Sequence, residues 1–202
     1  MPDITKAVET AKKIAADNSH GYDQEERLGN PDYDCSSFVA KCLRDAGFNV
    51  ARDSWTGNLY SQLIKCGFKN IDDSTVKAGD IFLTPERHVV IAVSPTKIAH
   101  ASLNEKGKIT GGEPGDQTGK EICIRSFYTP SYGWKYHLRY EPDEPEVETG
   151  TGSYIAPKLL ADIIDGKYGV WPEREEKIRA MGLNYDTVQY LVNQTIKANE
   201  GL

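Results

Sequence analysis

This 202-residue sequence lacks long apolar runs, closely spaced cysteines and any excess of positive charge. No apolar stretch approaches the roughly 18 residues that a membrane helix needs, so we expect no membrane insertion. The first segment, residues 1–18, is amphipathic and has no uninterrupted apolar core. We therefore expect no signal peptide and synthesis in the cytoplasm. With 24 basic and 30 acidic residues, the chain also has no basic surface suited to nucleic acid or anionic lipid.

Cysteine is also scarce, which limits the chemistry that sulfur can serve here. Four cysteines are too few for a disulfide scaffold, and no Cys-x-x-Cys pair is present. A structural zinc site is therefore disfavoured, and reduced thiols are expected. Cys35 and Cys42 nevertheless lie seven positions apart in PDYDCSSFVAKCLRDAGF, residues 31–48. A bridge, a metal site, core packing and catalysis are all open interpretations of this pair.

The clearest change in composition is an acidic stretch, EPDEPEVETGTGS, at residues 141–153. It contains five acidic residues, no basic residue, two prolines and two glycines, and almost nothing to bury. This composition is typical of an extended linker. We therefore predict a domain at residues 1–140, this linker, and a module at residues 154–202. The alternative is a long surface loop within one domain, although structureless loops of this length are uncommon in compact domains.

Before the linker, the pattern changes from helices to strands. Apolar residues keep helical spacing near residues 4–15 and 35–46, and Gly47 follows the second of these helices as a stop. From Ala78 onward, short β-rich segments alternate with turn residues: DIFLT, HVVIAV, KIAHAS, EICIRSF and WKYHLRY. Helices followed by antiparallel strands indicate an α+β domain.

After the linker, three short helices are predicted, which would form a small all-α module. The segments are APKLLADIIDG, PEREEKIRAMG and DTVQYLVNQTIKAN. Each has apolar residues at helical spacing or end residues that suit a helix. A module of this length has room for only a small core.

One arrangement of residues in the first domain indicates nucleophilic catalysis. Cys35 lies in the first turn of a predicted helix, whose N-terminus favours a thiolate. Asp34 opposes that effect, so a further cation is needed. A nucleophilic cysteine also needs a histidine to take its proton and a partner to orient that histidine. His88 opens one predicted strand and His100 lies in the next, and the short turn SPT makes the two strands a hairpin.

Each of these residues also has a plainer interpretation. A lone cysteine beside an apolar helix usually packs in the core, and a histidine that opens a strand is usually structural. A metal site formed by Cys35, His88 and His100 has suitable ligand types but lacks local ligand spacing, so we expect no metal. Cys42, two turns beyond Cys35 on the same helix face, is expected only to pack.

Three segments in order, YDCSSFVAKCLRDAGF, AGDIFLTPERHVVIAV and KIAHAS, resemble the NlpC-type cysteine peptidases. These are papain-like enzymes that cleave the peptide part of bacterial cell walls. The sequence departs from the family at Ser37, where a small residue, often glycine, is usual, and at Val90, where glycine is common. The segment at residues 111–140 also looks like the corresponding part of phage-encoded lytic enzymes. The matching motifs are Asp34-Cys35-Ser36, Gly79-Asp80, His88-Val89 and His100-Ala101.

The resemblance implies a papain-like domain and a role for each motif residue. Cys35 would attack an amide carbonyl as the thiolate. His88 would form an ion pair with it and later protonate the leaving amine, while His100 would hold the His88 ring. Backbone N–H groups at the helix start would stabilise the oxyanion. No cofactor is implied, and the substrate is expected beside Tyr22, Asp34 and Ser36.

The C-terminal sequence LLADIIDGKYGVWPEREEKIRAMGLNYDTVQYLVNQTIK resembles a three-helix cell-wall-binding repeat of phage lysins. In that family the repeat binds the glycan-peptide wall directly. Tyr168, Trp171 and Arg174 are expected to contact the wall, because aromatic faces and a guanidinium suit sugar and amide groups. Core filling is the alternative for the two aromatic residues.

These resemblances together indicate a peptidoglycan hydrolase of the phage endolysin type, whose partner is bacterial peptidoglycan. It would be made in the host cytoplasm and act on the wall after release. The expected reaction is γ-D-glutamyl or D-glutaminyl endopeptidase cleavage, and the alternative is an N-acetylmuramoyl-L-alanine amidase. Two other classes also stay open: a non-catalytic wall-binding protein, and a papain-like transferase or deamidase that modifies a partner protein.

Overall fold

A computed structural model of the chain describes residues 2–72, 74–141 and 157–200. The chain divides into two units, Met1–Pro142 and Asp143–Leu202. Except for Glu141, the linker predicted at residues 141–153 lies outside the described residues. Residues 154–156 and 201–202 of the predicted C-terminal module also lie outside them.

A six-stranded antiparallel sheet forms the centre of the first unit, with the order β1-β6-β2-β3-β4-β5. The β-rich segments predicted five of these strands. The strand that was not predicted, β1, has only three residues and one buried side chain, so its sequence carries no alternating pattern. The bounds are β1 Phe68–Asn70, β2 Ile81–Thr84, β3 His88–Ser94, β4 Lys97–Ala101, β5 Ile122–Ser126 and β6 Tyr136–Tyr140.

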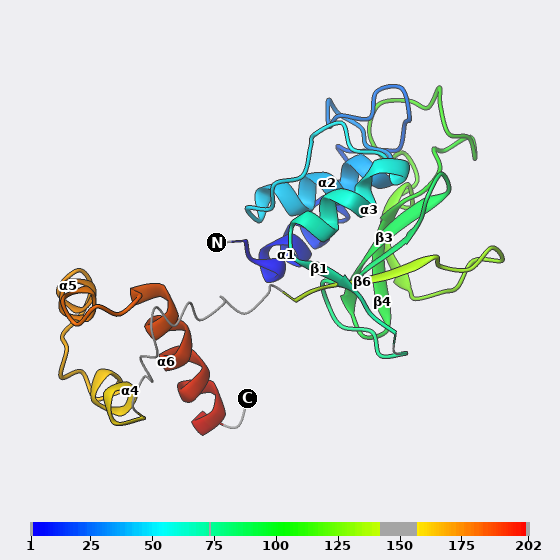
Figure 1. The fold of residues 1–202 in the computed structure, drawn as a ribbon. Helices are drawn as coiled ribbons and strands as arrows, with labels where there is room; N and C mark the ends of the chain where they lie inside the picture. Colours follow the sequence, from blue (N-terminus) through cyan, green and yellow to red (C-terminus); the bar gives the residue numbers. More distant parts are fainter. Residues whose placement is uncertain (1, 73, 142–156, 201–202) are drawn as a thin grey trace. The chain divides into compact units, whose positions relative to one another are not determined.

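Three helices, α1 Ile4–Ile14, α2 Cys35–Asp45 and α3 Thr56–Lys65, pack on one face of this sheet (Figure 1). The middle helix, α2, packs against β3 and β4, and its inner face is completely buried. Burial of each large apolar side chain contributes about 1.5–3 kcal/mol, so this face fixes the position of the helix on the sheet. Cys42 belongs to the buried face and packs there, as predicted.

The opposite face of the sheet is covered by a smaller apolar cluster. Phe82, Val90, Ala92 and Ile98 are buried in it. Partly buried aromatic residues from the segment at residues 127–135 pack against these side chains. Val90, one of the two departures from the NlpC-type pattern, therefore fills this second core.

The first turn of α2 is held by reciprocal capping. Asp34 is the N-cap, and its Oδ1 accepts a hydrogen bond of 2.7 Å from the backbone N–H of Ser37. The backbone N–H of Asp34 in turn donates to Ser37 Oγ at 2.9 Å. Such a capping box satisfies N–H groups that the helix cannot pair by itself. Ser37, the other departure from the NlpC-type pattern, thus fixes the turn that carries Cys35.

A buried ion-pair network ties β2 to β6. Asp80 accepts from Arg139 Nε at 2.8 Å and from Arg139 Nη2 at 2.7 Å. His137 Nε2 lies 2.7 Å from Asp80 Oδ2. Asp80 belongs to the Gly79-Asp80 motif, and its carboxylate therefore has a structural role in this fold.

In the described part of the second unit, residues 157–200, three helices surround a small apolar core. They are α4 Pro157–Ile164, α5 Glu173–Ala180 and α6 Tyr185–Glu200, and α6 packs against both of the others. The core side chains are Ile163, Ile178, Val188 and Val192. In the part of the chain that the structure describes, no helix has the length and apolar character to cross a membrane.

Candidate active site

Cys35 is the first residue of α2, and its side chain is buried. Its thiol lies against β3, where the backbone N–H of Val89 interacts with the sulfur. Burial raises the thiol pKa to about 12, and the charge of Asp34 adds to this rise. The backbone N–H groups of Val89 and Ser36 and the charge of Arg27 lower the pKa in part. The resting thiol is therefore protonated at neutral pH.

The structure brings the two predicted histidines together. His88 Nε2 lies 3.2 Å from His100 Nδ1, and the two rings meet edge to face. Burial lowers the pKa of His88 to about 4 and that of His100 to about 3. Both rings are therefore neutral near pH 7. If His88 donates its Nε2 proton to His100, its Nδ1 is left as a proton acceptor.

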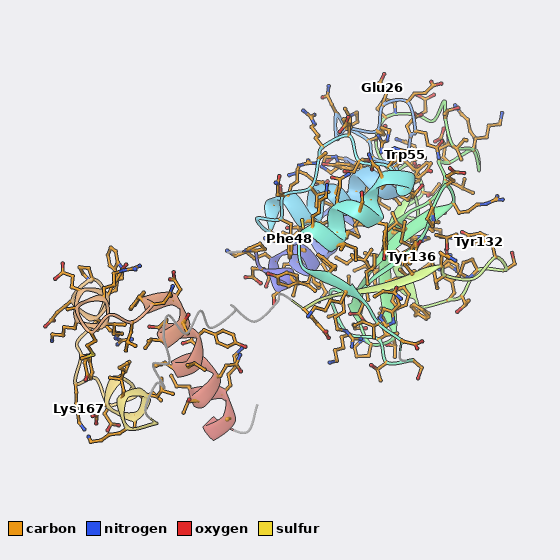
Figure 2. The ribbon with its side chains drawn as sticks, in the orientation of Figure 1. Glu26, Phe48, Trp55, Tyr132, Tyr136 and Lys167 are labelled. Atoms are coloured by element: carbon orange, nitrogen blue, oxygen red, sulfur yellow. The ribbon has the colours of Figure 1, made fainter. Side chains whose placement is uncertain are left out.

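Aromatic residues that the sequence analysis did not single out surround these histidines. The ring of Trp134 stacks on His88 with centroids 6.1 Å apart, and its Nε1 donates to the Tyr128 carbonyl at 2.9 Å. Tyr132, in the same segment, is half exposed and lies near enough to Cys35 for their charges to interact. Figure 2 shows Tyr132 on the loop before β6 and Trp55 at the start of α3. In the sequence, the aromatic run YTPSYGW was the signal that could have identified Tyr128, Tyr132 and Trp134.

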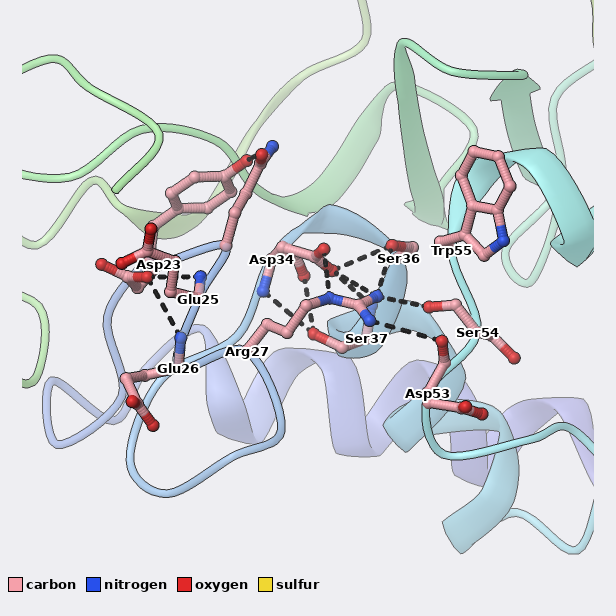
Figure 3. A network of polar contacts seen from close by, with 12 residues as sticks. Asp23, Glu25, Glu26, Arg27, Asp34, Ser36, Ser37, Asp53, Ser54 and Trp55 are labelled. Carbon is pink, nitrogen blue, oxygen red and sulfur yellow. Dashed lines mark hydrogen bonds and ion pairs between the residues drawn. The ribbon is translucent and has the colours of Figure 1, made fainter. Parts of the chain in front are cut away.

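Arg27 supplies the cation that Asp34 requires, and the sequence analysis did not identify it. Its Nε donates to Asp34 Oδ2 at 2.5 Å, and its Nη2 donates to Asp34 Oδ1 at 3.3 Å (Figure 3). The same guanidinium donates to Ser36 Oγ at 3.0 Å and to the backbone carbonyls of Asp53 and Ser54. Arg27 thus neutralises the carboxylate beside the thiol and ties the start of α2 to the chain before α3.

The three side chains expected beside the substrate are buried near the start of α2. Tyr22 is buried, its hydroxyl accepts from Gln24 at 3.0 Å, and burial together with the charge of Cys35 raises its pKa. Asp34 and Ser36 are also buried, and Ser36 Oγ donates to Asp34 Oδ1 at 2.9 Å. Asp34 and Ser36 therefore hold the helix start, and their contact with substrate, like that of Tyr22, stays a prediction.

Two loops near the site are joined by carboxylates that accept backbone hydrogen bonds. Asp32 Oδ1 accepts from Gly21 at 2.7 Å and from Gly115 at 2.9 Å. Glu121 accepts from the backbone N–H of Tyr22 at 3.0 Å. A Cβ on Gly21 would lie only 2.2 Å from the Gly115 carbonyl oxygen, so this close approach requires glycine. These bonds hold Tyr22 and the glycine-rich loop in one place.

The three residues expected to contact the wall lie in different surroundings within the second unit. Trp171 is 70 % exposed, and its Nε1 donates to Glu175 at 3.1 Å, so core filling is the wrong interpretation for this residue. Tyr168 is partly buried and packs against the small core. Arg174 donates two hydrogen bonds to the Gly169 carbonyl, at 3.0 and 2.8 Å.

Metal ligation was the weaker interpretation of Cys35, His88 and His100. Among the described residues, no group of three or more histidine, cysteine or acidic side chains has a geometry that could hold a metal ion. These three residues therefore do not form such a group.

Three family models match parts of this chain. Residues 14–111 match a bacteriophage peptidoglycan hydrolase, and residues 98–149 match an endolysin-like domain. Residues 158–196 match a CW_7 repeat. None of the curated proteins matches the chain.

Several solved structures also match. NlpC1 from Trichomonas vaginalis is 21 % identical with a TM-score of 0.47; the match covers 69 % of this chain and 44 % of that protein, so the chain spans less than half of its length. The P60 domain of an antigen from M. avium subspecies paratuberculosis is 15 % identical with a TM-score of 0.44. That match covers 68 % of this chain and 98 % of the P60 domain. The type VI effector–immunity complex Tae3–Tai3 from Ralstonia pickettii is 14 % identical with a TM-score of 0.39, and covers 69 % and 99 %.

Proposed function

Because this chain is similar to phage peptidoglycan hydrolases and endolysin-like domains and carries a CW_7 repeat, we propose that it is an endolysin with a papain-like catalytic domain at residues 1–140. It cleaves an amide bond in the stem peptide of peptidoglycan. The carrying observation is the buried Cys35 thiol at the start of α2, against the strand that His88 opens, with His100 3.2 Å from His88. The enzyme is made in the host cytoplasm and meets the wall after release.

The three side chains divide the reaction between them. As Cys35 Sγ attacks the carbonyl carbon, His88 Nδ1 takes the thiol proton. The C–N bond then breaks, and His88 returns the proton to the leaving amine, which leaves a thioester on Cys35. Water, deprotonated by His88, attacks the thioester and releases the new carboxylate and the free thiol. His100 holds the His88 ring by accepting its Nε2–H.

The helix start supplies the remaining catalytic element. Negative charge develops on the substrate oxygen as the thiol attacks. Backbone N–H groups in the first turn of α2, including that of Cys35, stabilise this negative charge, and the positive end of the helix dipole adds to the effect. The capping box at Asp34 and Ser37 keeps this turn rigid, so little reorganisation is needed during the reaction.

The resting pair of Cys35 and His88 is neutral, which differs from the ion pair expected from the resemblance. Burial raises the thiol pKa to about 12 and lowers the His88 pKa to about 4. Transfer of the thiol proton from Cys35 to His88 before the substrate reacts would therefore cost more free energy here than in an exposed site. We infer that His88 acts as a general base in both attacks, by the thiol and by water, and carries a positive charge only from the moment it accepts each proton until it returns it.

The acid limb of kcat/KM is expected near pH 4, because the pKa of His88 in the free protein is lowered to about 4 by burial. Activity falls as pH decreases through this value, since a protonated imidazole cannot accept the thiol proton. An unperturbed histidine would place the limb near about pH 6.5. Initial rates on a soluble stem peptide across this range test the prediction, with aliquots returned to neutral pH to show that the loss is reversible. A limb near pH 6.5 would contradict it.

We propose that the bond cleaved is the one that follows the γ-D-glutamyl or D-glutaminyl residue, with the N-acetylmuramoyl-L-alanine bond as the alternative. Mass spectrometry of digested muropeptides distinguishes them. A new free amine on the diamino acid indicates an endopeptidase, and one on L-alanine indicates an amidase. If neither amine appears with the wild-type chain, the hydrolase proposal fails.

The second unit, which we propose starts at residue 154 after the linker at 141–153, holds the enzyme to the wall. Tyr168, Trp171 and Arg174 remain our proposed contacts, and Trp171 is the strongest because its ring is exposed. Trp171→Ala is expected to weaken binding to purified peptidoglycan by about 1–2 kcal/mol, roughly tenfold, which is typical of an exposed aromatic anchor. Thermal unfolding should be unchanged, since no core contact is lost.

Met181→Ala is the matched control for Trp171→Ala, because Met181 is 49 % exposed in the same unit. Co-sedimentation of both variants with purified walls gives the comparison. Equal binding by Trp171→Ala and the wild-type chain would remove Trp171 from the contact surface.

A further inference from the structure

A cavity of about 470 Å³ opens on β4 and β5, and His100 of the proposed triad lines it. His100 and Cys123 are directly opposite each other in this strand pair, and both line the cavity. Ser102, Lys120 and Arg125 line it as well. We call this space the β4–β5 cavity. It shares a wall with the proposed triad, and no step of the mechanism accounts for it.

The charged groups of the β4–β5 cavity are all basic. Lys120 and Arg125 line it, and no carboxylate does. Within the described ranges neither cation has an ion-pair partner, and the recorded contact of Arg125 is with the face of the Tyr128 ring. Asp116, whose charge acts on Cys123, already accepts from the backbone N–H groups of Glu121 at 2.9 Å and of Ile122 at 3.2 Å. The cavity therefore presents two cations that form no ion pair with the described residues.

Tyr128 connects this cavity with the proposed nucleophile. The Arg125 guanidinium lies 4.7 Å above the centre of the Tyr128 ring, and the Tyr128 and His100 rings are 6.2 Å apart. The charges of both Arg125 and Cys35 act on the Tyr128 hydroxyl. Tyr128 therefore contacts a cation that lines the cavity and also lies near His100 and Cys35 of the proposed triad.

We propose that the β4–β5 cavity binds a free carboxylate of the stem peptide, carried next to the bond that Cys35 attacks. A guanidinium donates in a fork that matches a carboxylate, and a lysine ammonium adds a point charge. A carboxamide has nearly the same shape but no charge, so the cavity separates the two forms by electrostatics alone. This inference rests on the proposed function and narrows its substrate: γ-D-glutamyl peptides are preferred, and D-glutaminyl peptides are poor substrates.

Three stem peptides test this inference, and they differ only in where a carboxylate is replaced with a carboxamide. One keeps both carboxylates, one is amidated on the glutamyl α-carboxyl, and one is amidated on the carboxyl of the following residue. We expect a loss of about tenfold in kcat/KM for the peptide amidated on the glutamyl α-carboxyl, mainly through KM, because the carboxamide cannot form an ion pair with either cation. A loss confined to the peptide amidated on the following residue would contradict the preference for γ-D-glutamyl peptides. Added salt should reduce the preference, since both cations are exposed.

Variants of Lys120 and Arg125 test whether the cavity causes the preference for a carboxylate over a carboxamide. The double change Lys120→Gln and Arg125→Gln should reduce the preference to about threefold or less, whereas Arg125→Lys, which keeps the charge but not the fork, should have an intermediate effect. Lys108→Gln is the matched control, because it removes one exposed charge from the same loop outside the cavity. A preference that is unchanged in the double variant, or absent in the wild-type enzyme, overturns the inference.

A binding measurement separates this inference from the proposed function. Cys35→Ala protein, titrated calorimetrically with the same three peptides, reports the carboxylate preference without turnover. Preferential binding together with no hydrolysis by the wild-type chain would support the cavity and reject the reaction. Hydrolysis with equal affinity for all three peptides would support the reaction and reject the cavity.

Discussion

Cys35→Ala is expected to abolish hydrolysis of purified peptidoglycan, with kcat/KM lowered by at least about 10⁴-fold. The reason is that the thiol forms the covalent intermediate, and no other nucleophile lies against the first turn of α2 among the side chains that we place in the site. His88 could still activate a water molecule, but nothing would hold that water in the position that the start of α2 gives to the Cys35 sulfur. Release of soluble wall fragments and mass spectrometry of the products measure the loss.

The fold should survive this change. Cys35 is an end residue of α2, and alanine is a good helix former that leaves only a small void at a site next to the solvent-accessible aromatic segment. Co-sedimentation with walls should be unchanged, because the second unit is untouched. Cys66→Ala is the matched control: Cys66 follows α3, is partly exposed, and its thiol donates only to the Asn49 carbonyl at 3.5 Å. A lytic Cys35→Ala variant would reject the thiol mechanism.

The sequence predicted those parts of the site that depend on local pattern. Helical spacing after Asp34 placed Cys35 in a first turn, and α2 begins at Cys35. Two β-rich segments joined by a short turn placed His88 near His100, and their nitrogens lie 3.2 Å apart. Both predictions rest on periodicity and turn length, which are properties of neighbouring residues in the chain.

The sequence did not predict parts of the site that depend on tertiary contacts. Arg27 lies in the polar run DQEERLGN, and nothing in that run indicates that the guanidinium folds back onto Asp34. Trp134 reaches His88 only because the loop before β6 folds over the second face of the sheet. A cation was required beside Cys35 on electrostatic grounds, but charge arguments give the sign of a partner and not its position in the chain.

Exposure was likewise not readable from residue type. Trp171 could fill a small core or face solvent, and the small size of the module slightly favoured the core. The core is completed by Ile163, Ile178, Val188 and Val192, with Tyr168 packed against them, which leaves Trp171 outside. A small module with enough aliphatic side chains can therefore keep a large aromatic residue on its surface, where it is available for binding.

Arg27→Met is expected to destabilise the first unit by about 3 kcal/mol and to lower kcat/KM by about 10²-fold. The change removes the bidentate contact to Asp34 and leaves a largely buried carboxylate without its cation. Removal of one partner from a buried pair costs more than the pair itself contributes. The remaining charge raises the pKa of the Cys35 thiol further, since Asp34 raises that pKa and Arg27 lowers it.

Three variants separate these effects. The rate at which iodoacetamide alkylates Cys35, measured at a fixed pH below the pKa of that thiol, follows the thiolate fraction. Alkylation of Cys35 should therefore be slower in Arg27→Met and faster in Asp34→Asn. Asparagine still caps a helix, so α2 should persist. The double variant, Arg27→Met with Asp34→Asn, has no unpaired charge and should recover most of the stability that Arg27→Met loses, as measured by urea unfolding. If alkylation proceeds at the wild-type rate in Arg27→Met, or if the double variant is no more stable than Arg27→Met, Arg27 does not act through Asp34. The expected pattern instead shows that this arginine positions the nucleophile's helix and compensates the carboxylate beside the thiol.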